Sequence, residues 1–301
     1  MKVWIPHRQG GELLGPVPDG VRLEVFDAEP PSDPAEVEFY VPPFLAGPEA
    51  TEVLPRMSRL EVIQLLTAGA EVWLGRVPAG VTLCDAQGVH TSATAEWTVA
   101  AILAYVRDFP RFARAQAQRV WDQTGTDQLA GKRVLIVGAG DIGEAIAARL
   151  APFEVSLTLV ARRARDGVHG IDELPSLLPE ADVVVLIVPL TDATRGMVDA
   201  EFLGRMPDGA LLVNAARGPV VDTKALTEEL ATGRIGAALD VTDPEPLPSE
   251  HPLWTMPNLL LTPHVAGSVS GVLPRAYQLV GEQLRRYAVG EPLRNVVADG
   301  Y

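Results

Sequence analysis

The sequence predicts an α/β protein with two domains, each built around a parallel sheet. Short apolar segments of strand character alternate with helical or irregular connectors along most of the chain. This alternation is typical of parallel strands joined by crossover connections. Several strands in the second half, such as residues 183–188, are continuous apolar runs, as expected for a sheet covered on both faces. A length of 301 residues leaves room for two hydrophobic cores.

The expected domain boundaries follow from the order of these segments. A smaller domain takes up residues 1–91 and is completed by 269–301, and a larger domain takes up 92–268. Strands of the smaller domain are expected at 3–5, 23–26, 37–41, 62–66 and 81–84. Helices are expected from 93 to about 108, onward to about 121, and from 270 to about 287. Strands of the larger domain are expected at 134–137, 155–160, 183–188, 211–214, 235–239 and 259–262.

The composition is that of a globular protein without nucleic-acid or membrane partners. Hydrophobic residues make up 47% of the chain, and the net charge of −14 opposes binding to nucleic acids and anionic membranes. No apolar run reaches the roughly 18 residues of a membrane span, and the N-terminus lacks a signal-peptide core. The single cysteine, Cys84, excludes an internal disulfide and is expected to be buried. We expect a cytoplasmic protein, and no metal, because no Cys, His and Asp cluster has ligand spacing.

A glycine motif directly follows the first strand of the larger domain. Residues 133–137 run into Gly138-Ala-Gly140-Asp-Ile-Gly143, which opens a segment of helical spacing. At such a junction the first glycine allows a tight turn, the second lets the backbone approach a pyrophosphate, and the third packs helix on strand. The helix N-terminus then binds the anion. We therefore expect a Rossmann-type, doubly wound sheet that binds a dinucleotide; the alternative is a tight turn without a ligand.

The residues after the second strand indicate which dinucleotide is bound. An acidic residue about 20 positions beyond the glycines usually binds the ribose 2′-hydroxyl of NAD. This chain has Arg162 and Arg163 there instead. Two guanidinium groups would bind the 2′-phosphate of NADP as fork-shaped donors. The sequence thus predicts a preference for NADP(H), with use of NAD(H) also possible. The alternative is a solvated basic loop.

Three further residues follow three different strands of the same predicted sheet. Arg217 follows the strand at 211–214, Glu245 lies in the turn after 235–239, and His264 follows 259–262. Because ligands bind beyond the carboxyl ends of parallel strands, the three side chains are expected near the dinucleotide. Taken singly, each could be an ordinary loop or surface residue. Together they favour a catalytic site.

These residue types suit hydride transfer to a 2-keto acid. Reduction of a carbonyl needs a proton donor at the oxygen, and histidine serves near neutral pH. Arginine binds the carboxylate and polarises the carbonyl. A carboxylate beside the histidine favours its charged form and orients the ring. The other histidines, His7, His90, His169 and His251, are not assigned a role.

At this point the motifs resemble the D-isomer-specific 2-hydroxyacid dehydrogenase family. The similarity covers about residues 90–290 and rests on 134–143, 188–196, 213–222, 238–246 and 262–267, in order and with matching spacing. The resemblance implies that Arg217, Glu245 and His264 are catalytic, and that the smaller domain is flavodoxin-like. It implies that Ala68 and Gly69, with Arg217 and His264, bind a small anionic substrate, and that the protein is a homodimer through the helices of 93–130. The implied cofactor contacts are Gly138, Gly140, Asp141, Ile142, Gly143, Arg162, Arg163, Val188, Pro189, Ala215, Ala216, Arg217, Asp240, His264 and Gly267.

The basic loop is similar to the branch of NADPH-preferring glyoxylate/hydroxypyruvate reductases. We therefore expect reduction of a small 2-keto acid to the D-2-hydroxy acid. Formate dehydrogenases of this superfamily carry Gln where Glu245 stands, which disfavours that activity. Alternatives on the same scaffold are oxidation of a D-2-hydroxy acid or of phosphite. A dinucleotide-sensing protein, as in the corepressor branch of the family, is a further alternative, because fold alone does not determine function.

Overall fold

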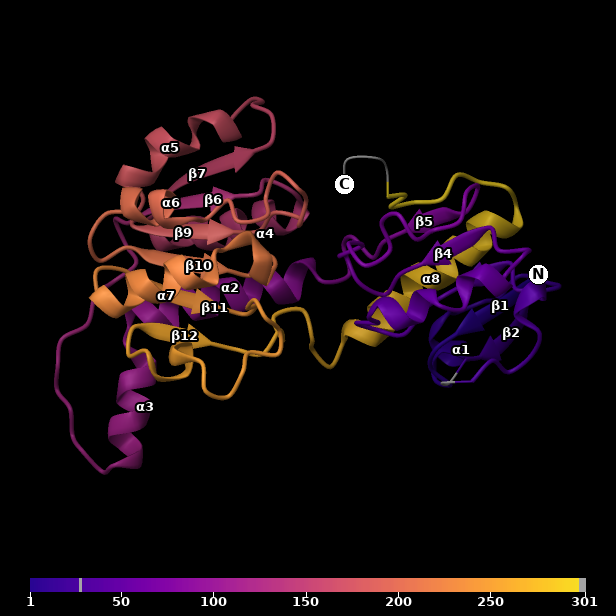
Figure 1. Cartoon of the computed structure of the whole chain (residues 1–301), viewed down its shortest axis with the longest axis horizontal. Helices are drawn as coiled ribbons and strands as arrows, with labels where there is room; N and C mark the ends of the chain where they lie inside the picture. Colours follow the sequence, from indigo (N-terminus) through magenta and orange to yellow (C-terminus); the bar gives the residue numbers. More distant parts are fainter. Residues whose placement is uncertain (27–28, 298–301) are drawn as a thin grey trace. The chain divides into compact units, whose positions relative to one another are not determined.

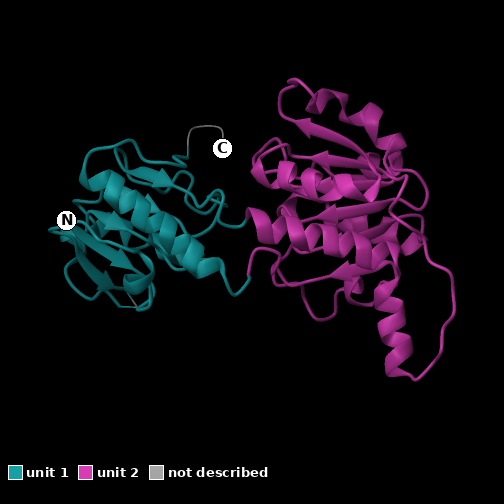
Figure 2. Cartoon of the chain, turned by 180° about the vertical axis from the view of Figure 1, so that it is seen from behind, with its two compact units in different colours: residues 1–90, 269–301 teal, residues 91–268 magenta. Residues whose placement is uncertain are grey.

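The computed structural model describes residues 1–26 and 29–297, and the chain divides into two compact units (Figure 2). The first unit combines the residues before Thr91 with the C-terminal segment from Val269 onward, and the second is Thr91–Ser268. Each unit contains one parallel sheet, of five strands in the first and seven in the second. The predicted α/β fold class is therefore confirmed.

The sheet of the first unit has the strand order β2-β1-β3-β4-β5, which is the flavodoxin-like order (Figure 1). Its strands are β1 (Lys2–Ile5), β2 (Arg22–Val25), β3 (Phe39–Tyr40), β4 (Val62–Gln64) and β5 (Thr82–Cys84). The connections are short, with helix α1 (Gly10–Leu13) and 3-10 turns that contain proline. The last helix, α8 (Val272–Ala288), packs its buried Tyr277 and Val280 into the core of this sheet.

Several predicted elements are shorter than the sequence pattern suggested, and two of them show a physical reason. The strand expected at 37–41 pairs only at Phe39–Tyr40, because the Val37 N–H bonds to Pro34 in a 3-10 turn. The helix expected to reach residue 121 ends at Ala117 as α3 (Phe109–Ala117). Arg119 has a φ of 59°, a left-handed conformation that does not continue a helix.

The sheet of the second unit has the order β12-β11-β10-β9-β6-β7-β8. Counted from β6, this is the Rossmann order 3-2-1-4-5-6 with one more strand. The strands are β6 (Arg133–Val137), β7 (Ser156–Ala161), β8 (His169–Gly170), β9 (Val183–Leu186), β10 (Leu211–Asn214), β11 (Gly236–Leu239) and β12 (Leu259–Leu261). The helices are α2 (Thr91–Val106), α3, α4 (Asp141–Leu150), α5 (Leu174–Leu177), α6 (Ala200–Arg205) and α7 (Thr223–Thr232). The two-residue strand β8 was not predicted.

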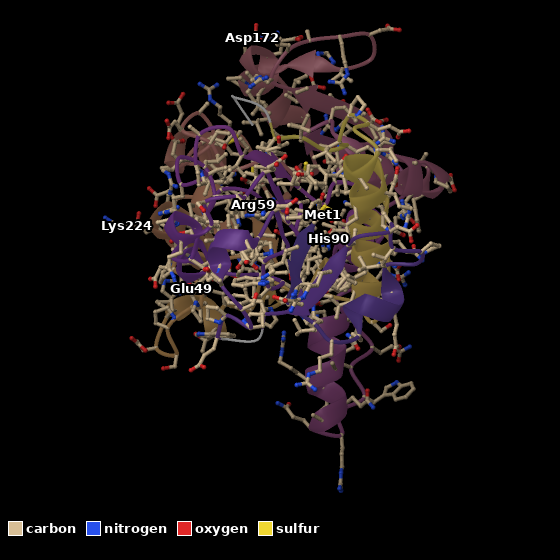
Figure 3. The ribbon with its side chains drawn as sticks, turned by 90° about the vertical axis from the view of Figure 1, so that its right-hand side faces the viewer. Met1, Glu49, Arg59, His90, Asp172 and Lys224 are labelled. Atoms are coloured by element: carbon tan, nitrogen blue, oxygen red, sulfur yellow. The ribbon has the colours of Figure 1, made fainter. Side chains whose placement is uncertain are left out.

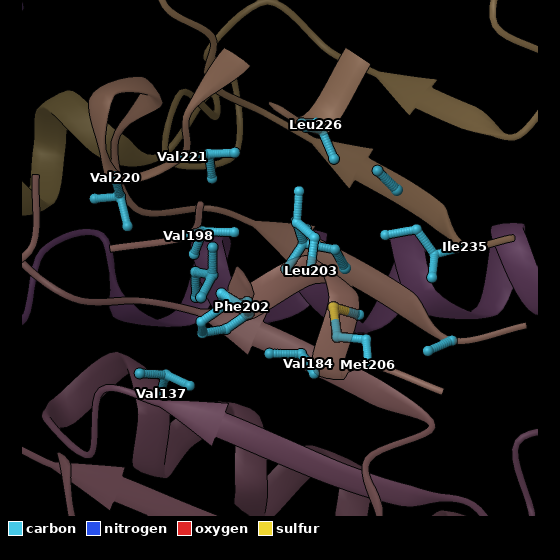
Figure 4. Close-up of a cluster of buried hydrophobic side chains, with 14 of the residues drawn as sticks. Val137, Val184, Val198, Phe202, Leu203, Met206, Val220, Val221, Leu226 and Ile235 are labelled. Atoms are coloured by element: carbon cyan, nitrogen blue, oxygen red, sulfur yellow. The ribbon is translucent and has the colours of Figure 1, made fainter. Parts of the chain in front are cut away.

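Both faces of this second sheet are covered. Alternate residues of a strand point to opposite faces, so Val184 packs with Phe202 and Leu203 of α6 (Figure 4). Val183 and its neighbours on the other face pack with residues of α2 and α4. Each fully buried valine or leucine contributes about 1.5–3 kcal/mol relative to an exposed one. The continuous apolar strands of the sequence therefore match a doubly wound sheet.

The surface carries the excess of acidic residues. Charged side chains such as Asp172 and Lys224 project outward (Figure 3), and the Lys224 side chain is 85% exposed. Of the helices that the structure describes, none has the length and apolarity needed to cross a bilayer.

Candidate active site

The three glycines after β6 have different surroundings. Gly138 has a φ of 120°, and a Cβ there would lie 2.4 Å from the Ile187 carbonyl oxygen. A Cβ on Gly143 would lie 1.9 Å from the Gly138 carbonyl oxygen, so α4 packs directly on the strand end. A Cβ on Gly140 would meet nothing within 4 Å. The first and third glycines are thus needed for the turn and its packing, and the second leaves open space at the start of α4, where a helix N-terminus favours an anion.

The first turn of α4 contains two predicted cofactor residues, Asp141 and Ile142. The Asp141 carboxylate accepts a hydrogen bond from the Thr91 hydroxyl at the start of α2. Ile142 is partly buried against the core formed by α2 and α4. Both residues are therefore fixed at the end of the helix that faces the glycine turn.

The basic loop after β7 contains one residue that sequence reasoning missed. Arg162 and Arg163 are exposed, which suits both a phosphate-binding loop and a solvated basic loop. Arg165, which is also exposed, reaches the glycine turn: its Nη2 donates to the Ala139 carbonyl oxygen at 2.5 Å. The backbone of Arg165 is held in a tight turn by two hydrogen bonds with Val168, each of 2.9 Å. Its place in the same Arg-rich run was the only signal in the sequence.

The strand order brings the other predicted residues to one edge of the sheet. Strands β10, β11 and β12 are neighbours, and Arg217, Asp240 and His264 follow their carboxyl ends. Val188 and Pro189 follow β9, next to β6 and the glycine turn. Ala215, Ala216 and Gly267 lie in the loops that carry Arg217 and His264. The second unit therefore collects the predicted catalytic and cofactor residues at a single edge.

A buried asparagine, Asn214, shapes the turn that carries Arg217. Asn214 is 1% exposed; its Oδ1 accepts the Ala216 N–H at 3.0 Å, and its Nδ2 donates to the Arg217 carbonyl oxygen at 3.0 Å. The half-buried Arg217 guanidinium donates to the Ala216 carbonyl oxygen at 2.7 Å. Sequence reasoning missed Asn214, although a polar residue at the end of a buried strand is a usable signal.

His264 and Glu245 are joined by a side-chain hydrogen bond. The Nδ1 atom of His264 lies 2.6 Å from Oε1 of Glu245. A carboxylate can only accept, so Nδ1–H donates and Nε2 is left for a reacting group. The two side chains are 31% and 41% exposed, which leaves the pair accessible to a ligand. Glu245 is therefore not simply a solvated acid in a proline-rich turn.

Asp240 holds the turn that presents His264. This residue is 2% exposed, and its carboxylate accepts the Thr262 hydroxyl at 2.6 Å. It also accepts the N–H groups of Val265 and Ala266 at 2.9 and 2.8 Å. These donors compensate its buried charge. His264 has a φ of 53°, a strained conformation for a residue with a side chain, and the surrounding hydrogen bonds maintain it.

The remaining predicted site residues, Ala68 and Gly69, belong to the first unit. They follow β4 and therefore lie at the carboxyl edge of its sheet. Of the unassigned histidines, His7 contacts the Tyr277 hydroxyl at 3.0 Å and His169 contacts Glu173 at 2.8 Å. Within residues 1–26 and 29–297, no group of three His, Cys, Asp or Glu side chains could hold a metal ion.

Comparison with known proteins adds two curated relatives. A glyoxylate reductase from Thermofilum pendens is 38% identical over 226 residues, which are 70% of this chain and 66% of that protein. A formate dehydrogenase from Arabidopsis thaliana is 34% identical over 237 residues, which are 74% of this chain and 62% of that protein. The relatives therefore include enzymes that act on different small acids.

Solved structures match over nearly the whole chain. A D-isomer specific 2-hydroxyacid dehydrogenase from Xanthobacter autotrophicus Py2, in complex with NADPH and MES, is 32% identical with a TM-score of 0.84, covering 99% of this chain and 97% of that one. An NADPH-dependent glyoxylate/hydroxypyruvate reductase from Sinorhizobium meliloti, in complex with NADP and sulfate, is 25% identical with a TM-score of 0.84, covering 98% of each chain.

The family described as "D-isomer specific 2-hydroxyacid dehydrogenase, NAD binding domain" matches residues 99–266, which include the glycine turn and all three strand-end residues. The match agrees with the strand order, the glycine surroundings and the Glu245–His264 pair. The chain belongs to the D-isomer specific 2-hydroxyacid dehydrogenase family, and it is an NAD(P)-dependent enzyme of that family.

Proposed function

We propose that the protein reduces a small 2-keto acid, such as glyoxylate or hydroxypyruvate, with NADPH. The product is the 2-hydroxy acid, of D configuration where it is chiral. The observation that carries this proposal is the 2.6 Å contact between His264 and Glu245 at the sheet edge that also carries Arg217. A proton donor, its carboxylate partner and a fixed cation are the groups that carbonyl reduction requires.

The bound cofactor supplies the hydride. In the proposed mechanism, charged His264 donates the Nε2 proton to the carbonyl oxygen of the substrate. Glu245 accepts the Nδ1–H bond, stabilises the positive ring and orients it. Arg217 binds the substrate carboxylate and stabilises negative charge on the oxygen. The backbone N–H groups of Ala68 and Gly69 are proposed to bind the same carboxylate.

We infer a preference for NADPH over NADH from the loop after β7. Arg162 and Arg163 are exposed there, and Arg165 of the same loop contacts the glycine turn. Structurally similar proteins were crystallised with NADPH or NADP. We also propose the cytoplasm as the compartment. The only cysteine, Cys84, is a free and buried thiol, so the chain forms no internal disulfide that would require an oxidising compartment.

We propose a homodimer through the segment that contains α2 and α3. Figure 1 shows α3 and the chain after it extending away from the sheet of their own unit. Helix α3 has no buried residue, and Phe109, Val120 and Trp121 are 59%, 54% and 92% exposed. Apolar side chains this exposed favour a protein partner. Light scattering should give twice the mass of one chain, and Trp121→Asp should lower the measured mass toward that of a single chain.

The proposed reaction is tested with a substrate panel and both cofactors. Glyoxylate, hydroxypyruvate and pyruvate are supplied with NADPH or NADH, and D-glycerate, D-lactate, formate and phosphite with the oxidised forms. We expect the highest kcat/KM for a 2-keto acid with NADPH. Faster oxidation of formate or phosphite would overturn the proposed substrate class. Tight NADPH binding without any turnover would favour a dinucleotide-sensing protein.

A further inference from the structure

The loop after β4 is here named the substrate loop and consists of Leu66, Thr67, Ala68, Gly69 and Ala70. Three of its carbonyl oxygen atoms accept hydrogen bonds from neighbouring groups. The Thr67 carbonyl oxygen accepts the Ala86 N–H at 2.9 Å. The Gly69 carbonyl oxygen accepts the Thr67 hydroxyl at 3.0 Å. The Leu66 carbonyl oxygen lies 2.9 Å from Nε2 of His90. Three peptide groups of the loop are therefore fixed through their oxygen atoms.

Fixing these oxygen atoms also fixes the direction of the N–H groups. In a trans peptide the C=O and the following N–H point in opposite directions within one plane. The bond between Leu66 and His90 therefore aims the Thr67 N–H away from His90. The bond between Thr67 and Ala86 aims the Ala68 N–H in the same way. The donors of the loop are thus oriented by groups on the opposite side of the backbone.

The surroundings of His90 fix its ring beside one of these peptides, the one between Leu66 and Thr67. The residue is 7% exposed, and its ring stacks on Phe44 with centroids 5.8 Å apart and planes 22° apart. A carbonyl oxygen only accepts, so Nε2–H is the donor to Leu66. The residue before it is fixed as well, because Arg275 Nε of α8 donates to the Val89 carbonyl oxygen at 3.1 Å. His90 is also the last residue before the chain enters the second unit.

We propose that His90 is a positioning residue, which orients the substrate loop so that its N–H groups receive the carboxylate of the substrate. The proposal rests on the proposed function in one respect, that the loop binds the substrate. His90 itself does not touch the reacting atoms. Its loss should leave the Leu66–Thr67 peptide free to rotate, which weakens substrate binding more than it slows the chemical step.

A pair of variants that differ by one methylene tests this role. In His90→Gln the amide nitrogen can occupy the place of Nε2, whereas in His90→Asn it falls one bond short of Leu66. We expect His90→Asn to raise the KM for the keto acid about tenfold, the equivalent of one lost hydrogen bond. Its kcat and the Kd for NADPH should stay within about twofold of wild type, and His90→Gln should restore KM. An equal KM rise in both variants, no rise in His90→Asn, or a parallel rise in the NADPH Kd overturns the proposal.

Hydrogen–deuterium exchange separates this proposal from the proposed function. In the free protein, amides of the substrate loop should exchange faster in His90→Asn than in wild type or His90→Gln, and unchanged exchange overturns the role of His90. A wild-type protein that reduces no keto acid would refute the proposed function alone, and exchange would then decide the role of His90. If His90→Asn does not fold, Phe44→Leu removes the ring on which His90 stacks and should raise KM at constant kcat; an unchanged KM overturns the proposal.

Discussion

The backbones of Gly218 and Thr242 touch, and a Cβ on Gly218 would lie 1.8 Å from the Thr242 carbonyl oxygen. Gly218 directly follows Arg217, and Thr242 precedes the turn that contains Glu245. The loops after β10 and β11 therefore fix each other, and only glycine fits at their contact. The positions of Arg217 and Glu245, the proposed cation and carboxylate of the site, are coupled through this contact.

We expect Gly218→Ala to displace both loops. The free energy of unfolding should fall by about 1–3 kcal/mol, the usual cost of overpacking, and kcat/KM should fall at least about tenfold. Gly204→Ala in α6 is the matched control, because an added Cβ there meets nothing within 4 Å and alanine favours a helix. Urea unfolding and steady-state kinetics measure both. Wild-type values for Gly218→Ala would show that the loops are not coupled.

The sequence was sufficient to predict which residues lie together at the carboxyl edge of the sheet in the second unit. Arg217, Asp240 and His264 each follow an apolar strand within a few positions, and parallel strands bring their carboxyl ends together. The contact between Glu245 and His264 could not be read in this way. Glu245 lies in a turn whose path depends on distant partners, such as the Thr223 hydroxyl of α7, which donates to the Asp243 carbonyl oxygen at 2.7 Å.

The supporting residues are harder to predict from the sequence than the proposed catalytic ones. Arg165 contacts Ala139, which lies 26 positions earlier, and no local pattern indicates that contact. The sequence assigns no role to His90, because its partner Leu66 lies 24 positions away. Periodicity reports which face of an element is buried, but a single polar side chain has no period. Its role becomes visible only when its hydrogen-bond partner is known.

Removal of Arg162 and Arg163 from the loop after β7 should abolish the preference for NADPH. A charge-assisted contact to the 2′-phosphate contributes about 1.5–3 kcal/mol, or roughly ten- to a hundredfold in relative kcat/KM. Arg162→Ala/Arg163→Ala should lose that factor with NADPH and keep nearly the same rates with NADH. Arg205→Ala/Lys224→Ala removes the same charge elsewhere and should leave the preference intact. Better use of NADH by wild type would mean that the loop does not bind a phosphate.

Arg217→Ala should abolish turnover and leave cofactor binding nearly intact. A cation that binds the reacting carbonyl more strongly in the transition state contributes at least about 3 kcal/mol, which corresponds to more than a hundredfold in kcat/KM. Arg217→Lys keeps the charge without the planar fork and should retain part of the activity. NADPH binding is followed by fluorescence titration. Near-normal kcat/KM in Arg217→Ala would remove this residue from the site.

Cys84 should be inert in the folded protein. Burial raises the pKa of this fully buried thiol to about 12, and the charge of Asp85 adds to the effect. At pH 8 only about one thiol in ten thousand is then ionised, and the thiolate is the reactive form. An aromatic disulfide reagent should detect one thiol per chain in denaturant and almost none in native protein. Rapid reaction of native protein would show that this part of the first unit opens.

Glu245 should set the pH range over which His264 delivers its proton. Reduction needs the charged imidazole, so the rate should fall as the pH rises and the ring loses its proton. The carboxylate 2.6 Å away stabilises that charge. Glu245→Gln removes the negative charge at constant size, so the fall in kcat/KM should begin at a lower pH.

The matched variant at the other end of this pair separates charge from position. His264→Gln removes the titrating group itself, so the alkaline fall should disappear and the rate should be low at every pH. Glu245→Gln should instead keep substantial activity at low pH, because the imidazole ring of His264 can still be charged there. A purely structural role of Glu245 in the turn predicts a lower rate with an unshifted pH profile. That outcome would leave the 2.6 Å contact as an orienting hydrogen bond without an effect of charge on His264.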